Sequence, residues 1–150
     1  MKENFTEEEW AMLKALSFIA FGIVASADGK IDDKEAGEMT RRLQTGAQGY
    51  KDPLHKELAM DILRSDIPAV IASAKNVELS KVRALLQDKL TQDEYQGFLG
   101  SIFVDMLAVA GVSGGFLGRG KIDSKEMTAL NSFAALFGID IGALKRRFAD

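Results

Sequence analysis

Two acidic turns carry the residue types best suited to chemistry in this chain of 150 residues. The first runs Asp28-Gly29-Lys30-Ile31-Asp32-Asp33-Lys34-Glu35, and the second runs Gly120-Lys121-Ile122-Asp123-Ser124-Lys125-Glu126. Over the seven shared positions, which lie 91 residues apart, the two copies differ only where Asp33 is matched by Ser124. An apolar segment precedes each copy and an amphipathic segment follows it, so the pattern indicates an internal duplication.

The carboxylates of the first turn have two interpretations, which the sequence leaves open. Asp32 and Glu35 have the spacing of a capping box that opens a helix. Asp28 has a weaker structural explanation, because an acid at the end of a helix faces the negative pole of its dipole. Crowded carboxylate oxygens suit a hard cation such as calcium or magnesium. The turn is therefore either a cation site or a solvated turn in which Asp32 and Glu35 only cap the following helix. Asp123 and Glu126 repeat the capping-box spacing in the second copy.

Two well-known ligand-binding loops, the EF-hand calcium loop and the nucleotide-binding P-loop, fit the acidic turns poorly. With Gly29 as the sixth residue of an EF-hand loop, Val24 would stand at the first position, where calcium needs a carboxylate. The segment 115–121 fits G-x-x-x-x-G-K, but Ile122 stands where a P-loop needs a hydroxyl group for magnesium. That segment also follows a predicted helix, whereas a P-loop follows a strand. We expect neither a standard calcium loop nor a nucleotide site.

The single histidine and the absence of cysteine narrow the possible chemistry further. Without cysteine, disulfides, thiolate zinc sites and cysteine nucleophiles are excluded. His55 lies beside the apolar stripe of a predicted helix, and we expect it to be a solvated surface residue. We likewise expect Arg41 and Arg42 to lie at the solvated end of a helix.

Composition and charge favour a cytoplasmic protein without nucleic-acid partners. The formal net charge is −3 and the pI is near 5.3, whereas nucleic-acid-binding domains are usually basic. The first residues are acidic, unlike the start of a secretory signal. The apolar run 16–27 is too short to span a bilayer. We expect no direct membrane insertion.

Helical periodicity extends along the whole chain. Capping boxes at Thr6-Glu9 and Thr91-Glu94 mark two helix starts, and Pro53 and Pro68 stand near two others. Residues 45–52 read as a loop, and Gly138 fits a helix C-cap. The predicted helices cover residues 7–28, 32–44, 53–63, 67–74, 79–90, 92–109, 123–137 and 140–148.

No segment alternates with the period of a strand, so we predict an all-α protein. The 150 residues suffice for a single domain with its own core. The predicted architecture is an orthogonal bundle of seven or eight helices with an internal pseudo-two-fold repeat. Several aromatic residues at helical spacing are predicted to lie in the core: Trp10, Phe98, Phe103, Phe133 and Phe137.

The residues of both turns also resemble a known family. Segment 23–35 is similar to the signature of the TerB-like tellurite-resistance family, and 120–126 resembles its second copy, followed by 133–140 near the end. The resemblance implies an all-helical fold with internal pseudo-symmetry and acidic residues around the repeated turn that bind metal. It also implies a link to tellurite and general stress resistance, with no catalytic reaction.

Carried over to this chain, the family's acidic positions fall on Asp28, Glu35 and Glu126. The second copy departs from the family pattern, because Arg119 stands where an acid is expected before Gly120. The loop 111–119 also looks like an insertion. Those departures leave the second site incomplete, although Asp105 is placed to approach it from the preceding helix.

These observations lead to a prediction of a non-enzymatic, metal-binding stress-response module that acts through partner binding. The partner is an unidentified protein, for example another stress-response protein. The predicted metal ligands are Asp28, Asp32, Glu35 and Glu126, and the expected cofactor is a divalent cation, calcium or magnesium. Two alternatives stay open. One is a metal-dependent hydrolase. The sequence near the acidic turns has no histidine and no nucleophile–base pair, which is evidence against this alternative. The other is a structural interaction domain whose carboxylates only cap helices.

Overall fold

The computed structural model describes residues 1–25, 33–113 and 124–140, and these stretches contain helices and no strand. Two short 3-10 turns, η1 (Lys2–Asn4) and η2 (Ala47–Gly49), accompany the α-helices. The all-α class is therefore confirmed for this part of the chain. The α-helices are α1 (Glu7–Ala25), α2 (Asp33–Gly46), α3 (Pro53–Leu63), α4 (Ile67–Ala74), α5 (Leu79–Lys89), α6 (Gln92–Ser113) and α7 (Ser124–Phe137).

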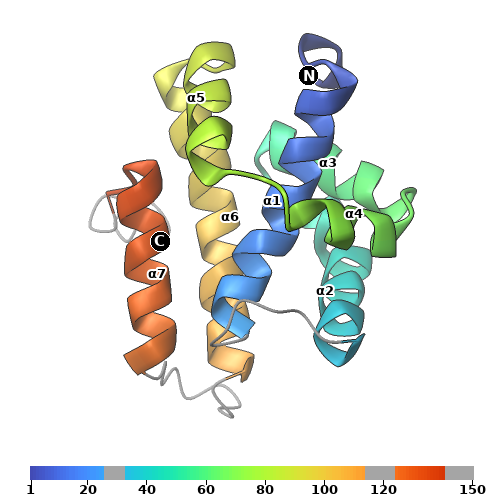
Figure 1. Ribbon diagram of the computed structural model, residues 1–150, viewed down its shortest axis with the longest axis vertical. Coiled ribbons are helices and arrows are strands. Elements are labelled where there is room, and N and C mark those ends of the chain that lie inside the picture. Colours follow the sequence, from blue (N-terminus) through green and yellow to red (C-terminus); the bar gives the residue numbers. More distant parts are fainter. Residues whose placement is uncertain (26–32, 114–123, 141–150) are drawn as a thin grey trace.

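The two long apolar helices, α1 and α6, pack against each other at the centre of the molecule. In Figure 1, α7 lies on one side of this pair and α2 on the other. Both helices contribute some of the largest fully buried side chains, among them Leu13, Phe18, Phe98 and Phe103. Burial of such apolar side chains is the main stabilising contribution to the fold. All five aromatic residues predicted to lie in the core are buried.

Both long helices begin with the predicted capping box. The Glu9 backbone N–H donates to Thr6 Oγ1 at 3.1 Å, and the Thr6 N–H donates to Glu9 Oε1 at 2.8 Å. Thr91 and Glu94 repeat this exchange at 3.1 and 2.9 Å. Each cap contributes about 1 kcal/mol by satisfying amides that lack a partner within the helix. The other two predicted boxes depend on side chains outside the described residues.

The two proline-containing helices begin where the sequence indicates, with an aspartate as the cap. The Asp52 side chain accepts a hydrogen bond from the His55 backbone N–H at 2.9 Å, and Pro53 occupies the first turn of α3. Asp66 does the same for α4, with Pro68 in its first turn. The Asp52 cap fixes the start of α3 and thereby the position of His55.

The structure departs from the sequence prediction in two connections. Residues 45–52 are not a plain loop, because α2 continues to Gly46 and η2 follows at once. Helix α6 continues beyond Val109 to Ser113 and includes Gly111. A glycine weakens a helix by roughly 1 kcal/mol relative to alanine but does not by itself end it. The predicted helix 140–148 lies outside the described residues, except for Asp140.

The C-terminus of α7 is closed by a glycine and by two other helices. Gly138 adopts φ +67, and the Ile139 N–H donates to the Ala134 carbonyl at 2.8 Å, as in a Schellman motif. From α5, Arg83 donates to the Leu136 carbonyl at 2.7 Å. From α6, the Tyr95 hydroxyl donates to the Phe137 carbonyl at 2.6 Å. Carbonyls that the helix leaves free are thus satisfied by its neighbours.

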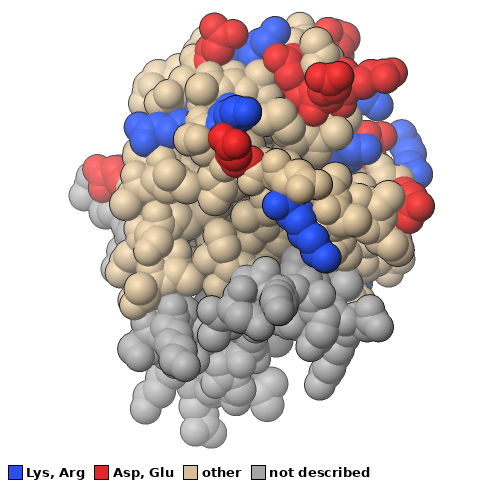
Figure 2. All heavy atoms as spheres, viewed as in Figure 1, with Lys and Arg blue, Asp and Glu red and all other residues tan. Residues whose placement is uncertain are grey.

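Charges of both signs are interspersed over the described part of the face shown in Figure 2. Acidic side chains gather near the N-terminal end of α1, whose first turn carries Glu7, Glu8 and Glu9. Negative charge there is favourable because it opposes the positive pole of the helix dipole. No helix in the described segments is both long enough and apolar enough to cross a membrane.

Candidate functional site

The predicted metal ligands fall largely outside the part of the chain that the structure describes. Asp28, Asp32 and Asp123 lie outside it altogether. Glu35 and Glu126 lie in the first turns of α2 and α7, but their side chains are not described. The metal site therefore stays a prediction. Within the described residues, no group of three or more histidine and carboxylate side chains converges on one point.

A polar cluster that the structure does describe lies between four segments of the chain. We call it the Asp105 cluster. It consists of Arg42 from α2, Tyr50 just after η2, His55 from α3, and Ser101 and Asp105 from α6. Ser101 and Asp105 are four residues apart, so the helix places them on one face, one turn from each other.

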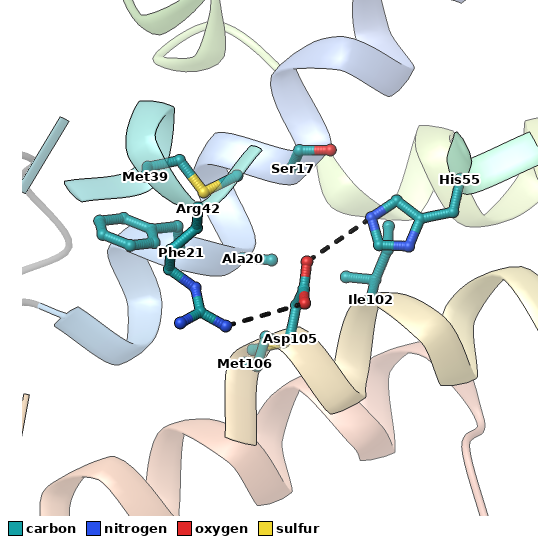
Figure 3. A pocket seen from close by; sticks show the side chains of 9 residues that line it. All are labelled: Ser17, Ala20, Phe21, Met39, Arg42, His55, Ile102, Asp105 and Met106. Carbon is teal, nitrogen blue, oxygen red and sulfur yellow. Dashed lines mark ion pairs between the residues drawn. The ribbon is translucent and has the colours of Figure 1, made fainter. Parts of the chain in front are cut away.

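Asp105 is the centre of these contacts. Its Oδ2 atom accepts a hydrogen bond from the Tyr50 hydroxyl and lies 3.7 Å from His55 Nε2. Its Oδ1 atom lies 4.0 Å from a guanidinium nitrogen of Arg42. The other ring nitrogen of His55, Nδ1, lies 2.5 Å from Ser101 Oγ. Figure 3 shows Arg42 and His55 approaching the carboxylate from two sides.

His55 is buried, so the expectation of a solvated surface residue is wrong. Only 3% of it is exposed. The Tyr50 ring stacks on the imidazole with centroids 3.8 Å apart, and Phe98 meets it edge-on at 6.2 Å. The turn η2, predicted as loop, brings Tyr50 over one side of the ring, and α6 covers another.

The expectation of a solvated Arg42 is also wrong. Its side chain is 24% exposed and faces Asp105 of α6. Helical periodicity within α2 shows which side chains lie off the apolar stripe. It does not show that α6 supplies a carboxylate at that point, because this contact joins segments far apart in the sequence.

Burial sets the protonation of the cluster. It lowers the pKa of His55 to about 4, because an apolar environment disfavours the charged form of a base. Burial raises the pKa of Asp105, while the Tyr50 hydrogen bond and the Arg42 charge act in the opposite direction. Burial and the Asp105 charge both raise the pKa of the Tyr50 phenol above its ordinary value. At neutral pH the imidazole is therefore neutral, and the phenol keeps its proton and donates it to Asp105.

A small cavity lies beside the cluster, between α1, α2, α3 and α6 (Figure 3). Its volume is about 20 Å³, measured as the space open to the centre of a water molecule. Polar and apolar groups share its walls, which are formed by Ser17, Ala20, Phe21, Met39, Arg42, His55, Ile102, Asp105 and Met106.

The cluster contains the residue types of a serine hydrolase but not the required environment. Ser101 lies in the interior of α6, where backbone N–H groups already donate to carbonyls one turn earlier. These amides are not free to stabilise an oxyanion, which acyl transfer requires near the nucleophile. The arrangement is better suited to holding α2, α3 and α6 together.

One signal for this cluster was available in the sequence. Asp105 interrupts the apolar run Ile102-Phe103-Val104-Asp105-Met106-Leu107. A carboxylate in such a run is rarely buried unless it has partners. The partners themselves, Arg42 and Tyr50, could not be identified from spacing.

Comparisons with known proteins do not show to which family the chain belongs. It matches no family model and no solved structure. It is similar to the uncharacterized protein ORF11' of Methanothermobacter thermautotrophicus, with 28% identity over 134 residues covering 86% of each chain. That similarity extends over most of both proteins, but it establishes neither a family nor an activity.

Proposed function

We propose that this protein is a non-enzymatic, metal-binding stress-response module of the TerB-like type that acts by binding a protein partner in the cytoplasm. The first acidic turn holds a divalent cation, calcium or magnesium, through Asp28, Asp32 and Glu35. Glu126 belongs to a weaker second site, because Arg119 replaces the acid expected beside it. This proposal rests on the residue resemblance and on the chemistry of crowded carboxylates.

The observation that carries the proposal is the equivalent setting of the two turns. Each lies between a long apolar helix and a shorter helix: α1 and α2 flank the first, and α6 and α7 flank the second. Both long helices start with the same threonine–glutamate capping box. Thr91 lies 85 residues after Thr6, whereas the turns are 91 apart, so six extra residues precede the second turn. That difference fits the insertion inferred between 111 and 119.

The cavity supports the pseudo-two-fold repeat in the same way. Its α1 wall consists of Ser17, Ala20 and Phe21, and its α6 wall consists of Ile102, Asp105 and Met106. Each α6 residue lies 85 positions after its α1 counterpart, the same separation as that of the capping boxes. The shared 85-residue offset of the cavity walls and the capping boxes supports the proposed repeat. We propose on this basis a bundle of two duplicated helix pairs in orthogonal packing.

A hydrolase is the less favoured reading. The Asp105 cluster lacks free amides beside Ser101, for the reason given above. A hydrolytic metal would require an open coordination position together with several protein ligands. In the sequence, neither acidic turn has a histidine or a nucleophile–base pair nearby.

Metal-titrated melting together with elemental analysis of gently purified protein tests the proposal. Calcium or magnesium should raise the melting temperature, and binding at a hundred times the dissociation constant contributes about 2.7 kcal/mol. Asp28→Asn and Glu35→Gln should each remove most of that increment, and Glu126→Gln should remove less. Asp88→Asn is a matched control, because Asp88 is an exposed acid on α5.

A different result would favour the capping interpretation. If calcium, magnesium, manganese and zinc all leave the melting temperature unchanged, the turn binds no cation. Glu35→Gln should then be mild, because an amide can still close a capping box. A screen for metal-dependent hydrolase activity tests the remaining alternative, a hydrolase. Our proposal predicts no turnover with or without added cation.

A further inference from the structure

Two of the contacts to Asp105 are too long for direct hydrogen bonds. His55 Nε2 lies 3.7 Å from one carboxylate oxygen, and the Arg42 guanidinium lies 4.0 Å from the other. Direct N–H···O bonds span about 2.7–3.2 Å. A water molecule can bridge polar groups that face each other across more than about 3.5 Å.

The cavity beside these groups is large enough for such a bridge. A water molecule needs roughly 10–15 Å³ of space measured for its centre, together with two to four polar partners. The cavity offers about 20 Å³, and His55, Arg42 and Asp105 all line it. Ser17, whose side chain also lines the cavity, is mostly buried. The cavity therefore meets both requirements for a bound water molecule, sufficient volume and polar partners.

We propose that this cavity is a hydration site in which one ordered water molecule bridges His55 Nε2, the Asp105 carboxylate and the Arg42 guanidinium. The site does not depend on the metal-binding proposal. Its ligand is a small neutral molecule that can accept two hydrogen bonds and donate to a carboxylate, which water does.

The hydrogen bonds can be assigned consistently. In this assignment the Ser101 hydroxyl is the donor to His55 Nδ1, 2.5 Å away, and the ring proton lies on Nε2. That N–H and one N–H of Arg42 donate to the two lone pairs of the water oxygen. The water then donates one proton to the carboxylate of Asp105, whose Oδ2 atom also accepts from Tyr50. This assignment requires a neutral imidazole, which agrees with the lowered pKa of His55.

The space for the water comes from an alanine. Ala20 of α1 is the counterpart of Asp105, 85 positions earlier, and both line the cavity. Two side chains as large as aspartate at these equivalent positions would compete for the same volume. The small side chain of Ala20 leaves room on the α1 side of the carboxylate.

A high-resolution crystal structure, with NMR cross-relaxation between water and the His55 ring, tests the proposal. We expect one density peak within hydrogen-bonding distance of all three groups and a water contact to the imidazole. Ala20→Val should fill the space and remove both signals. Ala11→Val is the matched control, because Ala11 lies on the exposed side of α1 and carries the same helix penalty.

Three outcomes would overturn the proposal. One is a direct His55–Asp105 hydrogen bond below 3.2 Å with no density between the residues. Another is a peak with anomalous scattering and bond lengths near 2.0–2.2 Å, which identify a metal ion. The third is an Ala20→Val variant that folds and keeps both signals. If Ala20→Val does not fold, the wild-type density and the water contact decide the question.

Discussion

Within the Asp105 cluster, most of the polar contacts converge on Asp105 itself. It accepts a hydrogen bond from Tyr50 and faces both His55 and Arg42. These partners come from three segments outside α6. Loss of the carboxylate would leave the largely buried Tyr50 hydroxyl without its acceptor, and an unsatisfied buried group costs about 1–3 kcal/mol.

Asp105→Ala should therefore lower the free energy of unfolding by about 2–3 kcal/mol. Urea denaturation at pH 7 measures this change. Asp88→Ala on the exposed face of α5 is the control and should change stability by less than about 0.5 kcal/mol. Equal effects of the two variants would show that the cluster does not hold the helices together.

The lowered pKa of His55 predicts how the free energy of unfolding depends on pH. Its pKa in the folded protein is lowered to about 4 from 6.5. The unfolded chain therefore binds a proton more readily than the folded protein between these pH values. The stabilising contribution is present above pH 6.5 and is lost as pH falls toward 4, by up to about 3 kcal/mol. The raised pKa of Asp105 acts in the opposite direction and partly offsets the loss.

Urea denaturation at pH 7.5 and pH 5 checks this sign. The wild-type protein should be less stable at pH 5, and His55→Phe should lose most of that difference. A pH dependence that is unchanged in His55→Phe would mean that other groups cause it.

At the scale of elements, the C-terminus of α7 depends on glycine and on neighbouring helices. Gly138 has a positive φ, and a Cβ atom there would lie 3.3 Å from Arg83. Gly138→Ala should therefore destabilise the protein by about 1 kcal/mol or more. Gly37→Ala is the contrasting variant, because Gly37 lies within α2 with open space around it. It should stabilise by up to about 1 kcal/mol. Thermal denaturation of both variants tests the pair, and a common sign would contradict this account.

The starts of helices could be predicted from the sequence because the capping signals are local. Thr6, Thr91 and Pro53 each mark a boundary that the structure confirms. The Asp105 cluster could not be predicted in the same way. Burial of His55 depends on Tyr50 and on α6, which come close to His55 only in the folded protein. The acidic turns are a local sequence pattern and are therefore visible in the sequence, and their metal binding stays a prediction.

At the scale of the whole molecule, one hydrophobic core joins the described helices. Buried side chains from α1 through α7 form a single contiguous cluster. The single tryptophan, Trp10, is part of it and donates a hydrogen bond to Asp61 of α3 at 2.7 Å. A shared core of this kind favours cooperative unfolding.

Unfolding followed by Trp10 fluorescence and by far-ultraviolet circular dichroism should give coincident transitions. The circular dichroism spectrum should be predominantly helical. Two separate transitions would mean that the α6–α7 pair unfolds independently of the first half of the chain.

The packing of α1 against α6 also has a consequence for protein synthesis. Helix α1 ends at Ala25, but α6, which packs against it, ends only at Ser113. At roughly 5–20 residues per second, a ribosome needs about 4–18 s to translate the intervening segment. During that interval α1 has left the ribosome, or is leaving it, without its principal packing partner. We therefore expect the apolar face of α1 in the nascent chain to stay without this cover until translation is nearly complete.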